Sequence, residues 1–251
     1  MAREIATAVD WPCEVKTLFR KRNLGCRMAV SSAVTWFFRQ EPEGIVLEDD
    51  VLPHPDFFPF CDTLLAHYRD TPRVMQISGN NFQLGKRWGD ASYYFSIFNH
   101  IWGWASWARA WNLCDLDMPG FRSFMRHTFP RRFPLPEASA YFMTQFERIA
   151  RGTLDTWDYS WQYCHFLHDG LTVIPNVPLA KNIGFGSGAH CLDPSVWAGL
   201  EPASMPLPLV QPDRIGADMD ADKTAFRTVW KAGGTSLESL LALGMERART
   251  G

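Results

Sequence analysis

The sequence predicts an α/β fold with a central, buried strand. Short apolar runs bounded by Gly or Pro, such as 44–47 and 171–175, are typical of buried strands. Stretches with apolar residues at helical spacing lie between them, as in 26–38. At 251 residues, 46% hydrophobic and 21% charged, the chain is long enough to bury a sizeable core.

The first half of the chain is expected to alternate between helices and strands. The helix over 26–38 carries Val30, Val34 and Phe37 on one face, and Glu41-Pro42 ends it. Asp56 is a credible N-cap for the helix that follows the second strand signal. The predicted elements are, in order, helix 26–38, strand 44–47, helix 57–68, strand 74–77, strand 92–98 and a tryptophan-bearing helix over 104–111.

The second half is less regular. Residues 115–136 mix Arg, Phe and Pro and predict an irregular surface segment, and residues 213–222 predict an acidic loop. The remaining predicted elements are helix 141–150, a helix capped by Thr156, strand 171–175, a glycine-rich loop over 181–190 and helix 236–249. We expect a main domain over 1–195 and a C-terminal loop and helix extension over 196–251.

Three consecutive acids, Glu48, Asp49 and Asp50, follow directly after the strand 44–47. Ligands of α/β sheets bind in the crevice at the carboxyl ends of strands. Three adjacent carboxylates repel one another, and a hard cation such as Mn²⁺ or Mg²⁺ relieves that repulsion with oxygen ligands. The pattern therefore predicts a site for a metal and a diphosphate, with a solvated acidic loop as the alternative.

Two further segments carry candidate site residues. Asn80 lies in the loop after the strand 74–77, which the same crevice rule places beside the acids, although a plain Gly-Asn turn explains it equally well. Trp102 and Trp104 lie in an aromatic stretch in which most tryptophans are expected to belong to the core.

Asp158 lies in the first turn of the helix that Thr156 is expected to cap. The helix dipole stabilises an ionised carboxylate there, which keeps it available as a general base. An ordinary first-turn aspartate is the simpler alternative, and Asp155 is the second candidate for a base.

The acidic triplet resembles the Asp-x-Asp motif of GT-A type nucleotide-sugar glycosyltransferases. Its Glu-Asp-Asp form, followed by Pro-x-Phe-Phe, resembles N-acetylglucosaminyltransferase I and a group of bacterial relatives. Trp157-Asp158-x-x-Trp161 resembles the Trp-Asp element that carries their catalytic base, and Lys21-Arg22-Asn23-Leu24-Gly25 resembles an Arg/Lys-Asn-x-Gly motif near the nucleotide.

The resemblance implies a GT-A (Rossmann-like) fold, which is a three-layer sandwich around a mixed, mainly parallel sheet. It also implies metal-dependent, inverting transfer of a sugar from a nucleotide-diphosphate sugar, with UDP as the nucleotide. The acceptor would be a carbohydrate or glycolipid, as in the synthesis of bacterial surface polysaccharide. Asp50 would hold the metal, Asp49 its water shell or the ribose, and Glu48 the donor sugar. Asn80 and the tryptophans would shape the acceptor side, Lys181 would contact the diphosphate, and His190 would contact the diphosphate or ligate the metal.

The metal motif comes about a hundred residues into most GT-A chains, and here it begins at residue 48. The family's first strand and helix have no match in this sequence, so we expect an N-terminally truncated form of the fold. A non-catalytic remnant that binds a sugar nucleotide is therefore one alternative. A haloacid dehalogenase-type phosphatase is another, although it needs an aspartate nucleophile where this chain has Glu48.

Net charge, hydropathy and cysteine content limit the kinds of partner and the cellular location that we expect. A net charge of −2 gives no electrostatic reason to expect nucleic acid or an anionic membrane as a partner. No apolar run approaches the ~20 residues of a membrane span. Six scattered cysteines without a Cys-x-x-Cys motif fit free thiols in a cytoplasmic protein.

Overall fold

The structure is a computed structural model, and it describes residues 2–184 and 200–231. A five-stranded sheet has the order β1-β5-β3-β6-β4, and a small second sheet pairs β2 with β7. The strands are β1 (Glu43–Val46), β2 (Val51–Pro53), β3 (Val74–Ser78), β4 (Tyr93–Ser96), β5 (Trp104–Trp107), β6 (Leu171–Pro175) and β7 (Ala180–Asn182). The helices are α1 (Ala2–Thr7), α2 (Gly25–Phe38), α3 (Phe57–Tyr68), α4 (Ala108–Trp111), α5 (Phe121–His127), α6 (Phe129–Arg132), α7 (Pro136–Ala150), α8 (Asp158–Leu167) and α10 (Met219–Phe226), with a π-helical turn over Arg227–Lys231.

The α/β class and the mixed sheet are confirmed, but the expectation of a mainly parallel sheet is wrong. In the five-stranded sheet only β3 and β6 pair in parallel, whereas the β1–β5, β3–β5 and β4–β6 pairs are antiparallel. Parallel neighbours need a crossover connection. Three strands, β1, β3 and β6, run in one direction, and α3 or the segment from α4 to α8 lies in the connections between them. β4 and β5 follow β3 without an intervening helix, and both run in the opposite direction, so they separate or flank the parallel strands.

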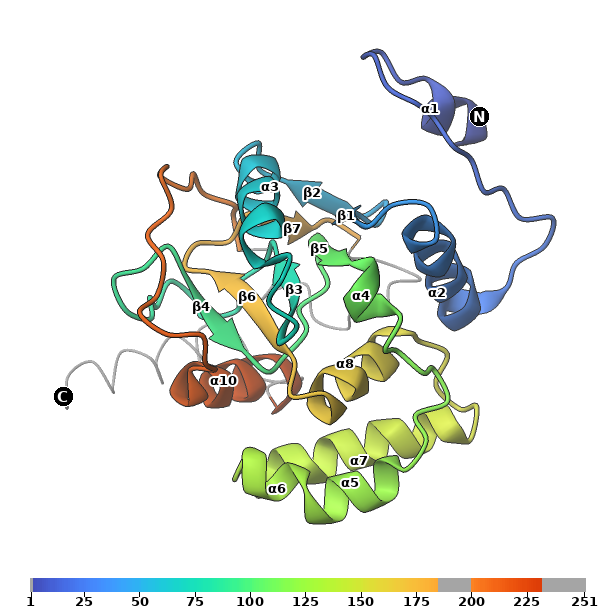
Figure 1. The fold of residues 1–251 in the computed structure, drawn as a ribbon. Helices are drawn as coiled ribbons and strands as arrows, with labels where there is room; N and C mark the ends of the chain where they lie inside the picture. Colours follow the sequence, from blue (N-terminus) through green and yellow to red (C-terminus); the bar gives the residue numbers. More distant parts are fainter. Residues whose placement is uncertain (1, 185–199, 232–251) are drawn as a thin grey trace.

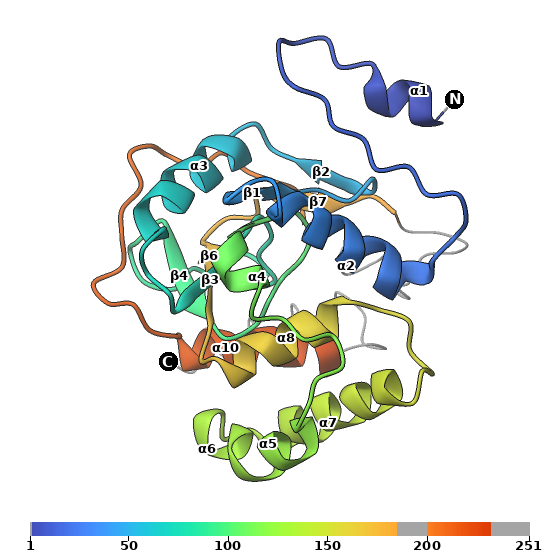
Figure 2. The ribbon, with the colours of Figure 1, turned by 45° about the vertical axis from the view of Figure 1, so that its right-hand side comes forward.

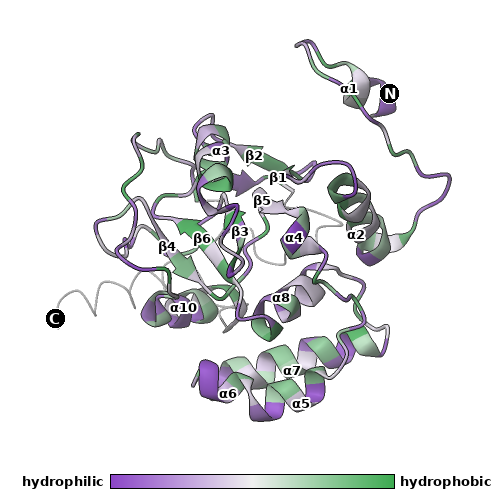
Figure 3. Cartoon of the chain, in the orientation of Figure 1, coloured by the Kyte–Doolittle hydropathy of each residue, from purple (hydrophilic) through white to green (hydrophobic). Residues whose placement is uncertain are grey.

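Helices cover both faces of this sheet (Figures 1 and 2). On one face, α3 buries Phe57, Phe60 and Leu64 against Ile77 of β3 and Val173 of β6. The other face packs against α2 and α8 through a cluster that includes Val34, Met75, Trp104, Trp111, Trp157 and Trp161. Because β3 and β6 are covered on both sides, they are largely hydrophobic, as Figure 3 shows.

The segment 115–136 is more regular than its sequence indicates. It forms α5 and α6, which pack with α7 beneath α8 in a layer of their own (Figure 1). Buried phenylalanines hold this layer together, among them Phe121, Phe129, Phe133 and Phe142. Pro130 lies in the first turn of α6, where a proline costs no hydrogen bond, so its presence does not break the helix.

The tryptophan stretch forms a strand where a helix was expected. Trp104–Trp107 is β5, and only Ala108–Trp111 is helical. β5 pairs with β1 on one side and β3 on the other, and this hydrogen bonding outweighs the helical spacing of the tryptophans. The expectation that most of them belong to the core is confirmed, because Trp104, Trp107 and Trp111 are all buried.

One other local expectation is wrong, and a second is confirmed only in position. The acidic stretch near residue 220 forms α10, because the Asp218 side chain accepts hydrogen bonds from the backbone N–H groups of Asp220 and Ala221 and so caps the helix. Asp56 occupies the N-cap position of α3, as expected, but its side chain makes no capping bond; its carboxylate accepts hydrogen bonds from the hydroxyl of Ser204 (2.6 Å) and the N–H of Met205 (2.9 Å).

The ends of the described chain differ in how they meet this core. Residues 200–231 cross the sheet edge, where Ala217 pairs with Phe95 of β4 and α10 packs on the same strand. In Figures 1 and 2, α1 stands apart from the body at the end of an extended segment. The helix that was expected over residues 236–249 lies outside the described residues. None of the described helices is long and apolar enough to cross a membrane.

Candidate functional site

The acidic triplet lies in a turn between β1 and β2. The N–H of Val51 donates to the carbonyl of Glu48 at 3.1 Å, which closes the turn. Glu48 and Asp50 are half-buried and Asp49 is exposed. The three carboxylates after the end of β1 therefore lie in different environments, and only Asp49 is exposed.

Glu48 lies beside Asp158, which the sequence places far away at the start of α8. Burial, and after it the charges of Asp50, Asp158 and Asp49, raise the pKa of Glu48 to about 7, while a hydrogen bond with Trp157 acts to lower it. A carboxyl group that feels several like charges is typical of sites that hold a cation or perform acid–base chemistry. The structure thus brings the predicted donor-side acids and the predicted base together.

Asp158 is the first residue of α8, and its neighbours fix its position. The hydroxyl of Thr156 donates to the Asp158 carboxylate. The side-chain amide of Asn99 donates to the Asp158 carbonyl at 2.9 Å. The helix itself is anchored to the sheet, because the indole N–H of Trp161 donates to Gln76 of β3 at 2.7 Å.

Thr156 does not cap α8 as the sequence predicts. The residue at the cap position is Trp157, and no side chain makes a capping hydrogen bond there. The Thr156 hydroxyl is directed to the carboxylate of Asp158 instead of to the backbone.

Asp155, the second candidate for a base, has a different partner. Its carboxylate accepts hydrogen bonds from the backbone N–H groups of Cys26 (2.8 Å) and Arg27 (3.1 Å) at the start of α2. A carboxylate at a helix N-terminus satisfies donors that have no intrahelical partner. Asp155 therefore joins α2 to the segment that leads into α8.

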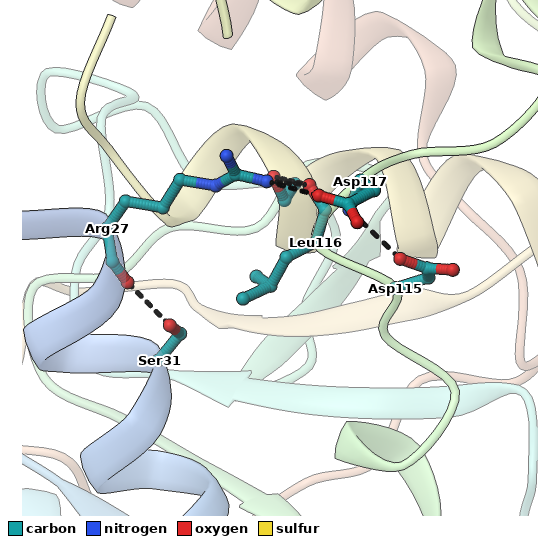
Figure 4. A network of polar contacts seen from close by, with 6 residues as sticks. Arg27, Ser31, Asp115, Leu116 and Asp117 are labelled. Atoms are coloured by element: carbon teal, nitrogen blue, oxygen red, sulfur yellow. Dashed lines mark hydrogen bonds and ion pairs between the residues drawn. The ribbon is translucent and has the colours of Figure 1, made fainter. Parts of the chain in front are cut away.

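Arg27 strengthens the same connection from the other side. Its Nη2 donates to the carbonyl of Leu116 at 2.6 Å and contacts the carboxylate of Asp117 at 3.1 Å, and Figure 4 shows this network beside α2. The Leu116 carbonyl also accepts a bond from the Ser160 hydroxyl of α8 at 3.1 Å. The start of α2, the loop after α4 and the start of α8 form one connected frame around Asp158.

Asp50 faces the end of β7. The N–H of Ile183 donates to the Asp50 carbonyl at 2.7 Å, and a Cβ added to Gly184 would lie 2.4 Å from Asp50 Oδ2. Only glycine lets the backbone approach the carboxylate so closely. Lys181, on β7, forms an ion pair with Glu201 at 2.7 Å, so its ammonium group is already engaged.

Asn80 and Trp102 lie next to each other, as the predicted acceptor side requires. The N–H of Trp102 donates to Asn80 Oδ1 at 3.2 Å, and the N–H of Gly79 donates to the carbonyl of Gly103 at 2.7 Å. Asn80 Nδ2 is buried without a hydrogen-bond partner within the described structure. Trp102 is half-buried, whereas Trp104 is fully buried, so a ligand could reach only Trp102 of the two.

Asn23 is exposed and lies in the segment before α2. Its Oδ1 accepts the N–H of Gly25 at 2.8 Å, which shapes the entry into α2. His190, the second predicted metal ligand, lies outside the described residues.

The carboxylates fit a metal held by a single protein ligand. Within residues 2–184 and 200–231, no group of three His, Cys, Asp or Glu side chains is arranged to hold an ion on its own. Asp50 Oδ1, however, is buried and has no hydrogen-bond partner there. A buried carboxylate oxygen without a partner is costly, and a hard cation that keeps waters and substrate phosphates in its shell would satisfy it.

Sequence reasoning missed two residues of this site. Cys26 lies near Glu48, Asp158 and Asp155, and burial together with these charges raises the pKa of its thiol. Trp157 is buried and hydrogen-bonds Glu48. Spacing places Cys26 on an amphipathic helix, and the motif resemblance concerns Asp158 rather than Trp157. Neither signal predicts a contact of Cys26 or Trp157 with Glu48.

Comparison with known proteins adds no assignment: neither a scan against protein-family models nor a search of curated proteins found a match to this chain.

Proposed function

We propose that this protein is a metal-dependent, inverting glycosyltransferase that moves a sugar from a nucleotide-diphosphate sugar to an acceptor hydroxyl. The observation that carries the proposal is the convergence of Glu48 and Asp50, at the end of β1, with Asp158, at the start of α8. A donor-side cluster of acids opposite a separately held carboxylate is the arrangement that this reaction needs. The resemblance of both motifs to GT-A enzymes gives the reaction class, and UDP is the nucleotide proposed on that ground.

Asp50 is the residue that would hold Mn²⁺ or Mg²⁺, through the buried oxygen that has no other partner in the described structure. The bound cation would supply positive charge to the diphosphate as it leaves. Asp49, which is exposed beside it, would bind the waters of the cation or the ribose. Glu48 would hydrogen-bond the donor sugar.

Asp158 would take the proton of the acceptor hydroxyl as that oxygen attacks the anomeric carbon. Thr156 and Asn99 hold its carboxylate and its backbone, and the frame that joins α2 to α8 fixes its distance from Glu48. A base on the side opposite the leaving diphosphate gives inversion of the anomeric configuration. Asn80 and Trp102 would contact the acceptor, a carbohydrate or a glycolipid.

The test is calorimetric titration of UDP into the purified protein, with and without Mn²⁺. We expect binding that requires Mn²⁺ and is lost in Asp50→Asn, which keeps the shape of the side chain and removes its charge. Asp62→Asn, on the exposed face of α3, is the matched control and should bind as the wild type does. Failure of the folded wild-type protein to bind UDP with Mn²⁺ present would overturn the proposal.

Turnover separates the enzyme from a sugar-nucleotide-binding protein without activity. Asp158→Asn should bind UDP with unchanged affinity but lose transfer or slow hydrolysis of a donor sugar by a factor of ~10² or more. Binding by the wild type without turnover of any UDP-sugar offered would favour the non-catalytic alternative.

A further inference from the structure

Two cysteines from different segments pack at the same buried cluster. Cys114 belongs to the loop after α4, and Cys164 belongs to α8. Both pack in the cluster of tryptophans formed by Trp104, Trp111, Trp157 and Trp161. The Cys114 thiol interacts with the Cys164 thiol, and this interaction together with burial raises the pKa of the Cys164 thiol.

Contacts near the pair hold the loop along α8. The Ser160 hydroxyl donates to the carbonyl of Leu116 at 3.1 Å, and the Tyr163 hydroxyl donates to the carbonyl of Pro119 at 2.8 Å. Arg27 binds the same Leu116 carbonyl from α2 (Figure 4). These bonds hold the backbone of the loop that carries Cys114 against the helix that carries Cys164.

The two sulfurs differ in access. Cys114 is half-buried, so a small oxidant can reach it, whereas Cys164 is 2% exposed. A thiol that an oxidant can reach, next to a buried partner, is the arrangement in which the first is oxidised and the second resolves the product.

We propose that Cys114 and Cys164 form a reversible disulfide when the protein meets a hydroperoxide. The Cys114 thiolate attacks one peroxide oxygen and breaks the O–O bond, which gives a sulfenic acid and hydroxide. The Cys164 sulfur then attacks the Cys114 sulfur, an S–S bond forms, and the hydroxyl group leaves as water with the Cys164 proton. The two thiols lose two electrons in total, hydrogen peroxide accepts them, and a dithiol reverses the bond by exchange.

The disulfide would tie the loop after α4 to the helix that begins at Asp158. It would close a long chain segment that contains α5, α6 and α7, and so restrict the unfolded chain. We therefore expect the oxidised protein to unfold several degrees higher than the reduced one. This inference does not depend on the proposed glycosyltransferase activity.

Cys26 provides a matched control. It is half-buried and packs against the same cluster, but its charged neighbours are Glu48, Asp158 and Asp155. Cys26→Ser should therefore leave the disulfide unchanged, whereas Cys114→Ser should abolish it.

The experiment treats the reduced, full-length protein with one equivalent of hydrogen peroxide, blocks the remaining thiols with an alkylating agent and maps disulfides by mass spectrometry without reduction. We expect one linked peptide pair that contains Cys114 and Cys164, and a change in tryptophan fluorescence that dithiothreitol reverses. Separately alkylated Cys114 and Cys164, a link from either to another cysteine, or a link between two chains would each overturn the proposal. The mapping uses the wild-type protein, so it decides the question even if Cys114→Ser does not fold.

Discussion

Glu48 and Asp222 are two carboxylic acids with the same raised pKa of about 7 and different surroundings. Glu48 is half-buried at the end of β1, and after burial the main causes are the charges of Asp50 and Asp158. Asp222 is fully buried on α10, and burial dominates its shift. A pKa of about 7 thus arises in one place from desolvation with like charges and in the other from desolvation almost alone.

The hydrogen bonds of the two groups show what each does. Asp222 accepts a bond from the Ser96 hydroxyl at 2.5 Å and from the N–H of Ile97 at 3.1 Å, and these bonds attach α10 to the end of β4. Glu48 has a bond with Trp157 but lies among carboxylates that repel it. Asp222 is therefore a structural acid, whereas the fold tolerates Glu48 at a cost, which is the signature expected of a functional residue.

The largest expected effect is the pH dependence of stability that Asp222 causes. Its folded pKa lies above its unfolded value near 3.8, so between about pH 4 and pH 7 the folded state binds the extra proton. The stabilising contribution is complete below about pH 4 and is lost as the pH rises through 7, at up to ~1.4 kcal/mol per pH unit. Asp222→Asn should remove this loss, so the free energies of unfolding of the two proteins should diverge as the pH rises from 5 to 8.

Urea denaturation at several pH values measures that difference. Asn keeps an acceptor for the Ile97 N–H and can donate to Ser96, so the variant should match the wild type at low pH. Parallel curves across the whole range would contradict the assignment of Asp222 as a protonated structural acid.

Truncation of the same side chain should also be costly. Asp222→Ala leaves the buried N–H of Ile97 without its acceptor, and we expect a loss of about 2–3 kcal/mol in the free energy of unfolding at pH 5. Asp220→Ala, on the exposed face of the same helix, is the control and should change stability little. Equal losses in both variants would mean that helix propensity, not the buried bonds, sets the effect.

The sign should reverse at the candidate site. Glu48→Gln keeps the bond with Trp157 and removes one of the repelling charges, so at pH 8 without metal it should raise the free energy of unfolding by about 1 kcal/mol. Glu43→Gln, on the strand β1 that leads to Glu48, is the matched control, and it should lower stability, because Arg69 holds both oxygens of Glu43 and keeps its pKa below the usual range. A destabilised Glu48→Gln would place Glu48 in the structural class with Asp222.

The sequence predicted these regions unequally. The apolar strand before the acids and the helix after Asp56 could be predicted because periodicity and Gly or Pro boundaries are local signals. The tryptophan strand β5 could not, because its state depends on pairing with β1 and β3, which local spacing does not contain. Asp222 was predicted to be one acid of an acidic loop, because no local sequence signal indicates its hydrogen bond with Ser96.

The site itself was predictable only in part. The position of Glu48, Asp49 and Asp50 at the end of a strand follows from the apolar run before them. Their proximity to Asp158, which lies about a hundred residues later in the chain, was predicted only from the motif resemblance. Asp155 was predicted to be a spare base, and its bonds to the start of α2 depend on a contact between segments that no local rule supplies.

The smallest predicted effect concerns Thr156. Its hydroxyl donates to the Asp158 carboxylate, so Thr156→Val should remove one hydrogen bond from a half-buried acid and cost about 0.5–1 kcal/mol in the free energy of unfolding. Thr153→Val, whose hydroxyl donates to the Arg148 carbonyl at an exposed position, is the control and should cost less. If Asp158 is the base, Thr156→Val should also lower the turnover number of the enzyme without changing its affinity for UDP, because the hydroxyl orients the carboxylate and does not touch the nucleotide. A lowered UDP affinity with unchanged turnover would instead mean that this end of α8 belongs to the donor side, with Glu48, rather than to a separate base.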